Sequence, residues 1–392
     1  MAAATVSRWA RRYVLASVLF LIAWQVGCLV GVPRRTEVVL GLYGFVLHTV
    51  FGKAYSLVPT YFDRDLAFPC APAVQFPFVV VGTAGLVGAS LRVDLPWLGA
   101  AGAALWSLGV CVFVGTLVWT IRDNPTGRDT ATGGANAGRR SVDRLANAFV
   151  PVALVYLVAG TYGTLAVHTG LSPLFDGYVP RVTHLLAAGT AGLFVLALGF
   201  RLFPRFMVAS PPRPLVATVL SAGALGPVAL AAFLGDAPWF HLGALLESVA
   251  VIGFAAGLGL LFVRSERRRV GFYALLAGAA GGVVAVALGL WFAVVRPSPA
   301  AVLAHLRLNL LGFLGLTIVG AAYQFYPPAV GTWPGASDRT ALVSIGCLGA
   351  GLALQTVGLV GHLSPVTTLG ESLALAGAVL YAFLVAAAFA TR

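Results

Sequence analysis

Charged residues are scarce in this chain. Only 10% of its 392 residues are charged, 59% are hydrophobic, and Lys53 is the single lysine. A soluble domain normally carries about 25% charged residues to cover its surface, so this composition excludes an ordinary soluble fold. Apolar segments of about 20 residues, long enough to cross a bilayer as helices, follow one another instead. The sequence therefore predicts a membrane protein.

Several motif classes are missing as well. Neither C-x-x-C nor C-x-x-C-H occurs around the four scattered cysteines, which are Cys28, Cys70, Cys111 and Cys347. This excludes a zinc ribbon, a thioredoxin-like site and covalent c-type heme attachment. A Walker loop and an H-E-x-x-H motif are also absent, which argues against an ATPase or a zinc protease.

Twelve apolar segments can be laid along the chain, and they predict an all-α integral membrane protein with twelve transmembrane helices in one transmembrane domain. Their abundant glycine and alanine permit close helix contacts. The helices are expected to be continuous. Their approximate ranges are 13–32, 37–60, 73–93, 97–120, 145–168, 181–203, 213–234, 239–263, 270–294, 300–326, 341–361 and 368–390.

Arginines are concentrated in alternate loops. With the N-terminus in the cytoplasm, only five of them fall on the outer side: Arg34, Arg35, Arg92, Arg181 and Arg296. The positive-inside rule then predicts a multi-pass protein of the cell membrane with both termini in the cytoplasm. Membrane lipids, and not nucleic acid, are the predicted partners of the +12 net charge. Residues 123–143, rich in Gly, Thr, Asn and Arg, are predicted to form a flexible cytoplasmic linker.

A short motif recurs three times, each time with a small residue, an aromatic residue and a proline at fixed spacing. It lies in the second, sixth and tenth segments, so each copy has the same place in a unit of four helices. This predicts three pseudo-symmetric four-helix repeats over approximately 13–120, 145–263 and 270–390. The three copies are Gly52-x-x-Tyr55-x-x-x-Pro59, Ala197-x-x-Phe200-x-x-x-Pro204 and Gly320-x-x-Tyr323-x-x-x-Pro327.

A histidine precedes each copy of the motif, at His48, His184 and His305. Ionisable side chains inside membrane segments are costly and mark candidate functional sites. Together with Ala304-His305-Leu306-Arg307-Leu308-Asn309-Leu310-Leu311-Gly312, the helix count and the repeat resemble subunit I of the heme-copper oxidase superfamily. The resemblance extends to its cbb3-type branch and to shorter nitric-oxide-response relatives of the NnrS type.

The resemblance has clear departures. Catalytic members carry His-x-His on the tenth helix, whereas this chain has His305-Leu306-Arg307. Counted back from the proline, His305 matches the ligand of the high-spin heme, and Arg307 replaces the ligand of the low-spin heme. Thr36 and Glu37 stand where the second helix normally supplies the partner ligand, and the His-His pair of the copper site is missing. The resemblance therefore implies a degenerate centre and not a complete oxygen reductase.

Five residues are the candidate cofactor ligands or cofactor contacts. His184 and His305 are the first pair for axial ligation of a b-type heme, because their helices are related by the repeat and their predicted depths agree. The same two histidines, with His241 at the start of the eighth segment, are candidate metal ligands, with copper as the second cofactor. His48 is a further candidate heme ligand, and Arg307 would neutralise a heme propionate or extend to the outer interface.

Glu247 lies well inside the eighth segment without a basic residue three or four positions away. It is the candidate proton-relay group. Glu371, at the start of the last segment, is expected at the membrane interface.

Two functions remain open. The first is a heme-binding membrane protein in redox chemistry or in nitric oxide or oxygen handling, with an electron-donor protein or redox subunit as partner. The second keeps the fold and discards the cofactor, which leaves a transporter or a structural membrane protein.

Overall fold

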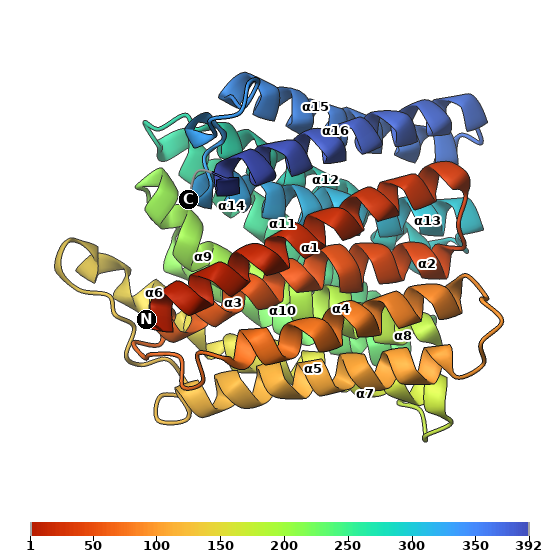
Figure 1. Ribbon diagram of the computed structural model, residues 1–392, viewed down its shortest axis with the longest axis horizontal. Helices are drawn as coiled ribbons and strands as arrows, with labels where there is room; N and C mark the ends of the chain where they lie inside the picture. The colour runs from red at the N-terminus through yellow and green to blue at the C-terminus, as the bar shows by residue number, and fades with distance from the viewer. Residues whose placement is uncertain (1, 391–392) are drawn as a thin grey trace.

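The computed structural model describes residues 2–390, which contain twelve helices long and apolar enough to cross a membrane and no β-strand. Each of the twelve predicted segments corresponds to one of these helices, so the predicted fold class is confirmed. The helices run side by side, and both termini lie at the same end of the bundle (Figure 1). We call this end the termini side and the other end the opposite side.

Each repeat contributes four spans, and the second span of each is divided by a π-helical segment. The first repeat contains α1 (Ala2–Val30), the span α2 (Arg34–Val38), η1 (Val39–Leu47) and α3 (His48–Tyr61), then α4 (Ala71–Ser90) and α5 (Leu98–Ile121). The second contains η2 (Gly134–Arg139), α6 (Arg140–Ala148), α7 (Val150–Thr169), the span α8 (Val179–His184), η3 (Leu185–Gly192) and α9 (Leu193–Met207), then α10 (Arg213–Phe233) and α11 (Trp239–Arg264). The third contains α12 (Val270–Val294), the span α13 (Pro299–Arg307), η4 (Leu308–Leu316) and α14 (Thr317–Phe325), then η5 (Pro328–Val330), α15 (Asp338–Val360) and α16 (Ser364–Ala390).

The repeats close into a ring. The last span of each repeat packs against the first span of the next, with α5 on α7, α11 on α12 and α16 on α1. The second, sixth and tenth spans lie inside this ring. Within their most apolar 18 residues, 94%, 78% and 72% are buried, against 33–56% in the other nine spans. A helix that is apolar all round is stable only where neighbours or lipid surround it, and here other helices surround the three central spans.

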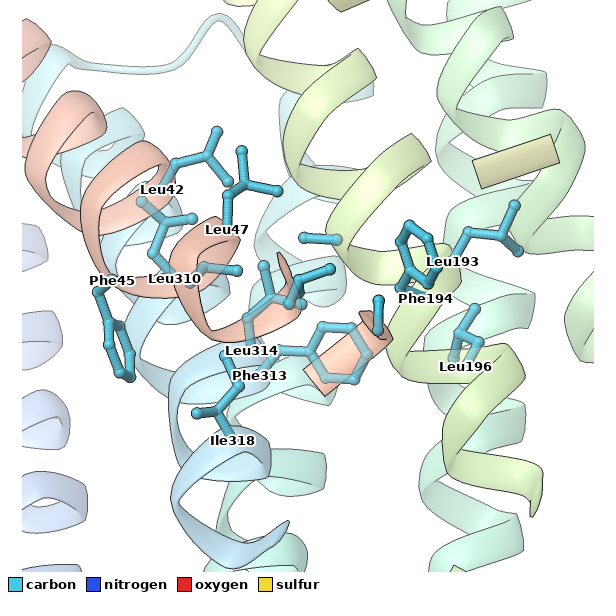
Figure 2. Packing of buried hydrophobic residues seen from close by; sticks show 14 of the residues in the cluster. Leu42, Phe45, Leu47, Leu193, Phe194, Leu196, Leu310, Phe313, Leu314 and Ile318 are labelled. Atoms are coloured by element: carbon cyan, nitrogen blue, oxygen red, sulfur yellow. The ribbon is translucent and has the colours of Figure 1, made fainter. Parts of the chain in front are cut away.

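The π-helical segments η1, η3 and η4 contact one another at the centre of the bundle. Figure 2 shows buried side chains from all three central spans around this contact, among them Phe45 of η1, Phe194 of α9 and Phe313 of η4. The predicted continuity is confirmed, since each central span is one unbroken helix. Its π-helical middle was not predicted, because a π-helical turn inserts an extra residue without interrupting the apolar run. Hydrophobicity alone therefore gives no sign of it.

Glycines allow the central spans to approach the first span of each repeat. The motif prolines are 145 and 123 residues apart, and Gly44, Gly189 and Gly312 are separated by the same two intervals. A Cβ at Gly44 would lie 2.5 Å from the Phe20 ring, and one at Gly189 would lie 2.5 Å from the Tyr156 ring. A Cβ at Gly312 would lie 3.4 Å from the Cα of Gly281. The contact with the first span is thus tight in the first two repeats and ordinary in the third, where the close neighbour of Gly312 is Leu352 of α15, 2.9 Å from its Cβ position.

The recurring motif serves packing. A Cβ at Gly52 would lie 2.5 Å from Tyr13 of α1, and one at Gly320 would lie 2.7 Å from the carbonyl oxygen of Gly271 of α12. In the first and third copies the small position therefore admits the first span of its repeat, at a place where even a methyl group would overlap it, whereas the second copy carries Ala197.

The aromatic position of the motif contacts the fourth span of the same repeat. Three edge-on ring pairs form in this way, with centroids 5.1, 5.3 and 5.7 Å apart: Tyr55–Phe113, Phe200–Phe254 and Tyr323–Tyr381. Such pairs contribute about 0.5–1.5 kcal/mol beyond the area they bury. The motif thus holds the first and fourth spans against the central span.

Buried polar contacts on the termini side anchor the segment between the first two repeats. The Arg201 guanidinium, 2% exposed, donates hydrogen bonds to the carbonyl oxygens of Tyr61 (2.6 Å) and Thr130 (2.9 Å). Asp143 accepts from Arg205 at 2.6 Å and lies 3.5 Å from Nε of Arg201. These contacts tie residues 123–143 to both repeats, and the predicted flexibility of the linker stays a prediction.

We predict that Gly320→Ala lowers the midpoint of thermal unfolding by an amount equivalent to about 1–3 kcal/mol. The added methyl group would overlap the Gly271 carbonyl, and relieving the overlap must move a packed backbone. Gly349→Ala in α15 is the matched control, because a Cβ there meets no atom of the described chain within 4 Å and alanine favours the helix. Equal midpoints for the two variants would contradict the packing role of the motif.

Candidate functional site

His305 lies in α13, near the opposite side of the tenth span. Its Nδ1 is 3.0 Å from the carbonyl oxygen of Ala285 in α12, so Nδ1 carries the proton that is donated. Nε2 is then the lone-pair nitrogen, and it accepts from the Asn309 side-chain amide at 3.2 Å. The ring is thereby fixed in one tautomer.

His184 is the last residue of α8 and is arranged in the same way. Its Nδ1–H donates to the carbonyl oxygen of Pro180 at 2.7 Å, which leaves the lone pair on Nε2. A histidine that ligates a metal usually donates its other ring N–H to a carbonyl, so both residues have the tautomer that ligation through Nε2 requires.

The repeat relates His184 to Arg307 and not to His305, the residue with which it was paired as a candidate ligand. His184 and Arg307 are separated by 123 residues, the same interval as Pro204 and Pro327. His184 is therefore the equivalent of Arg307, and His305 is offset from it by two residues. The two histidines come from related helices without being related positions.

His48 is the first residue of α3 and is fully buried. It follows its π-helical segment η1, whereas His184 and His305 precede theirs. Its Nδ1–H donates to the Tyr43 carbonyl oxygen at 2.7 Å, and its Nε2 has no hydrogen-bond partner in the part of the chain that the structure describes. The rings of Tyr13, Phe20 and Trp106 enclose it with centroids 6.2, 5.1 and 6.4 Å away.

His241 is exposed on α11, and its Nε2–H donates to the carbonyl oxygen of Ala293 at 2.7 Å. Within residues 2–390, His, Cys, Asp and Glu do not form any group of three that could hold a metal ion. The three-histidine arrangement of His184, His241 and His305 that the sequence suggested is therefore not assembled in the described chain.

Arg307 is the centre of a buried ion cluster. It donates to both carboxylate oxygens of Glu37, from Nη2 at 2.8 Å and from Nε at 3.0 Å. Its Nη1 donates to Glu371 at 2.7 Å and to the Gln355 side-chain oxygen at 3.2 Å. Trp24 and the Cys28 thiol also donate to Glu37, each at 3.2 Å. We call Arg307, Glu37, Glu371, Gln355 and Trp24 the Arg307 cluster.

The Arg307 cluster occupies the place where the resemblance puts the ligands of the low-spin heme. Glu37 on the second span and Arg307 on the tenth contact each other directly, with exposed fractions of 2% and 3%. A heme cannot lie between two side chains that share a bidentate ion pair, so the residues present do not fit that group. Four of the five guanidinium N–H donors are already used, which also limits what Arg307 can offer a propionate.

Glu371, expected at the membrane interface, is buried inside the protein: it is 7% exposed and pairs with Arg307. Its depth in the membrane stays a prediction. Gln355 was missed altogether. The signal that could have found both is their polarity within apolar segments, since a buried arginine needs acceptors from neighbouring helices.

Glu247 faces α10 at Gly226. Its Oε1 is buried without a hydrogen-bond partner among the described residues, and a Cβ at Gly226 would lie 2.7 Å from it. The next residue, Pro227, lies inside α10, and the Tyr156 hydroxyl takes the place of a backbone hydrogen bond there by donating to the Ala224 carbonyl (2.5 Å) and accepting from the Val228 amide (3.2 Å). The carboxyl of Glu247 and the phenol of Tyr156 thus both contact the same stretch of α10.

We predict that Arg307→Met destabilises the protein by about 3–5 kcal/mol, because two buried carboxyl groups lose their cation. The measurement is the midpoint of thermal unfolding in detergent. Adding Glu37→Gln and Glu371→Gln to Arg307→Met should recover a large part of the loss, since neutral amides cost less to bury. Arg122→Met is the control, because the Arg122–Asp123 pair is solvent-exposed. A loss no larger than that of the control would contradict the role of the cluster.

Comparison with known proteins supports the fold and not the activity. No protein-family model matches the chain, and no curated protein matches it. A solved cryo-EM structure of a heme-copper terminal oxidase dimer is similar over 98% of this chain and 83% of that chain, with a TM-score of 0.66 and 13% sequence identity. The chain therefore has the fold of heme-copper oxidase subunit I.

Proposed function

We propose that this chain is a heme-binding membrane protein with one b-type heme held by His184 and His305, acting in redox chemistry or in nitric oxide or oxygen handling. The observation that carries the proposal is the shared arrangement of the two rings. Both histidines donate Nδ1–H to a backbone carbonyl, at 2.7 and 3.0 Å, and keep a lone pair on Nε2. The oxidase-like fold is the second support.

The residues of the chain would serve the heme in distinct ways. A bound heme would supply an iron that exchanges single electrons, and with both histidines as ligands it would take up a diatomic gas only if one of them released it. Pro180 and Ala285 would keep the two imidazoles oriented through their carbonyl oxygens. The Asn309 amide, now on Nε2 of His305, would have to release that nitrogen and would then be a donor beside the site.

One heme at most fits this proposal. The Arg307 cluster fills the position of the low-spin ligands, so the second heme through which an oxidase takes up electrons has no place there. The protein would therefore handle or sense its gas, or pass electrons, without reducing oxygen to water. Copper enters the proposal only as another occupant of the His184–His305 pair, because His241 directs Nε2–H to the Ala293 carbonyl.

The remaining assignments are proposals of the same kind. Glu247, whose carboxyl lies against Gly226 of α10, would relay protons. The termini side would face the cytoplasm, the bundle would span the cell membrane, and an electron-donor protein or redox subunit would dock on it.

A cofactor-free transporter or structural membrane protein is the second candidate function. The specific observation in its favour is that both His305 nitrogens already have protein partners. In that case His184, His305 and Asn309 would form a polar contact between helices and no ligand set.

The experiment that separates the two functions is a dithionite-reduced minus oxidised absorption spectrum of protein expressed with a heme supply. We predict sharp b-type bands, a heme content near one per chain, and loss of the bands in both His184→Ala and His305→Ala. Each substitution removes one axial imidazole and leaves the iron without a pair of strong-field ligands.

His362→Ala is the matched control, because His362 is exposed in the turn between α15 and α16, at the opposite side and outside the pair. Its spectrum should equal that of the unsubstituted protein. A featureless spectrum with negligible metal content would overturn the heme proposal and favour the cofactor-free function. Bands that survive in both histidine variants would move the heme site elsewhere, with His48 next to be tested.

A further inference from the structure

A cavity of ≈ 80 Å³ lies between the three central spans on the termini side of the π-helical segments. Its walls come from α3, α9 and α14, with Val14 and Tyr381 added from the first and last spans. The lining residues form repeat-related triplets at the intervals of the motif prolines: Thr49, Phe194 and Thr317; Val50, Val195 and Ile318; Lys53, Leu198 and Ala321; Leu57, Leu202 and Phe325. The cavity therefore lies on the pseudo-threefold axis.

Lys53 breaks the symmetry of this cavity. Its two equivalents, Leu198 and Ala321, are apolar, and among the described lining residues Lys53 alone is charged. Its Nζ donates to the Tyr326 hydroxyl at 2.8 Å and lies 4.0 Å from the centre of the Phe325 ring. Within residues 2–390, Lys53 forms no ion pair with an acidic side chain. An ammonium group in an apolar membrane interior is costly without an anion.

The other polar side chains of the cavity wall are already used. The Thr49 hydroxyl donates to the Phe45 carbonyl oxygen at 3.1 Å, and the Thr317 hydroxyl donates to the Phe313 carbonyl oxygen at 2.6 Å. An ammonium group has three donors, and the hydrogen bond to Tyr326 accounts for one. The Lys53 ammonium group is thus the polar group that the cavity can offer a ligand, and the remaining lining is apolar.

We propose that this axial cavity binds an anionic single-chain amphiphile, a carboxylate carried on an alkyl chain. The carboxylate would accept charge-assisted hydrogen bonds from Lys53, which are the strong ones in a desolvated site. The alkyl chain would displace empty space or water from the apolar triplets around Val50 and Leu57. The site is separate from the heme proposal, because His184 and His305 precede their π-helical segments and the cavity follows them.

The test is equilibrium binding of tritiated decanoate to the full chain in nanodiscs. Partition into the lipid is the same for every variant, so differences between variants report the protein site. We expect Lys53→Leu to weaken decanoate binding by about tenfold to a hundredfold, the effect of losing one or two charge-assisted hydrogen bonds. Lys53→Leu removes a part-buried cation, so unfolding midpoints should confirm that the variant is folded.

The repeat supplies a rescue variant. Lys53→Leu combined with Leu198→Lys moves the cation to an equivalent wall of the same cavity and should restore binding in large part. Ala321→Phe keeps Lys53 but places a large side chain at the third equivalent position. The phenyl ring should occupy part of the cavity and thereby weaken decanoate binding. Decanol, the uncharged match of decanoate, should bind equally to the unsubstituted protein and to Lys53→Leu.

Decanoate binding that is unchanged in folded Lys53→Leu would overturn the proposal. Inorganic phosphate that competes as well as unlabelled decanoate would also overturn it, because the site would then recognise a free anion and not an amphiphile. A heme spectrum unaffected by Lys53→Leu is expected in either case, so the failure of this site and the failure of the heme proposal are distinguishable.

Discussion

Close contact among three apolar helices at the centre of the bundle organises the rest of this protein. The segments η1, η3 and η4 meet one another, and the glycines Gly44, Gly189 and Gly312 let an outer helix approach each of them. In a membrane, lipid is as apolar as leucine, so association must come from close packing and from polar contacts. Small residues at repeat-related positions permit this close packing in each of the three repeats. The ring of nine outer spans then follows from the need to cover three helices that are apolar on every side.

Polar contacts add specificity to this frame. The Arg307 cluster bridges the first, second, tenth, eleventh and twelfth spans, and Arg201 with Asp143 ties the first two repeats together on the termini side. Buried ion clusters contribute little net stability compared with apolar packing, but breaking one is expensive. They therefore fix which helices are neighbours. The Arg307 cluster also bears on heme binding, because it occupies the positions where the resemblance puts the two ligands of a low-spin heme.

The asymmetric positions are where function is to be sought. Three repeats with the same packing motif build a nearly symmetric scaffold, and a residue that departs from its two equivalents has no packing reason to be there. Lys53 against Leu198 and Ala321 is one such departure, and the equivalence of His184 with Arg307 is another. The first places a cation on the axis of the bundle. The second pairs a candidate ligand in one repeat with an ion-cluster residue in another.

The sequence by itself determined the fold class, the twelve spans and the place of the recurring motif, because a chain in a bilayer must satisfy its backbone inside each apolar segment. It also drew attention to His184, His305 and Arg307, since ionisable groups stand out in an apolar composition. Only the tertiary structure decided what those groups touch. Arg307 pairs with Glu37 and Glu371, which are 270 and 64 residues away in the sequence. The cavity at Lys53 exists only where three distant segments meet. Neither the π-helical turns nor these contacts leave a mark on local hydrophobicity, because they depend on which faces of different helices are pressed together.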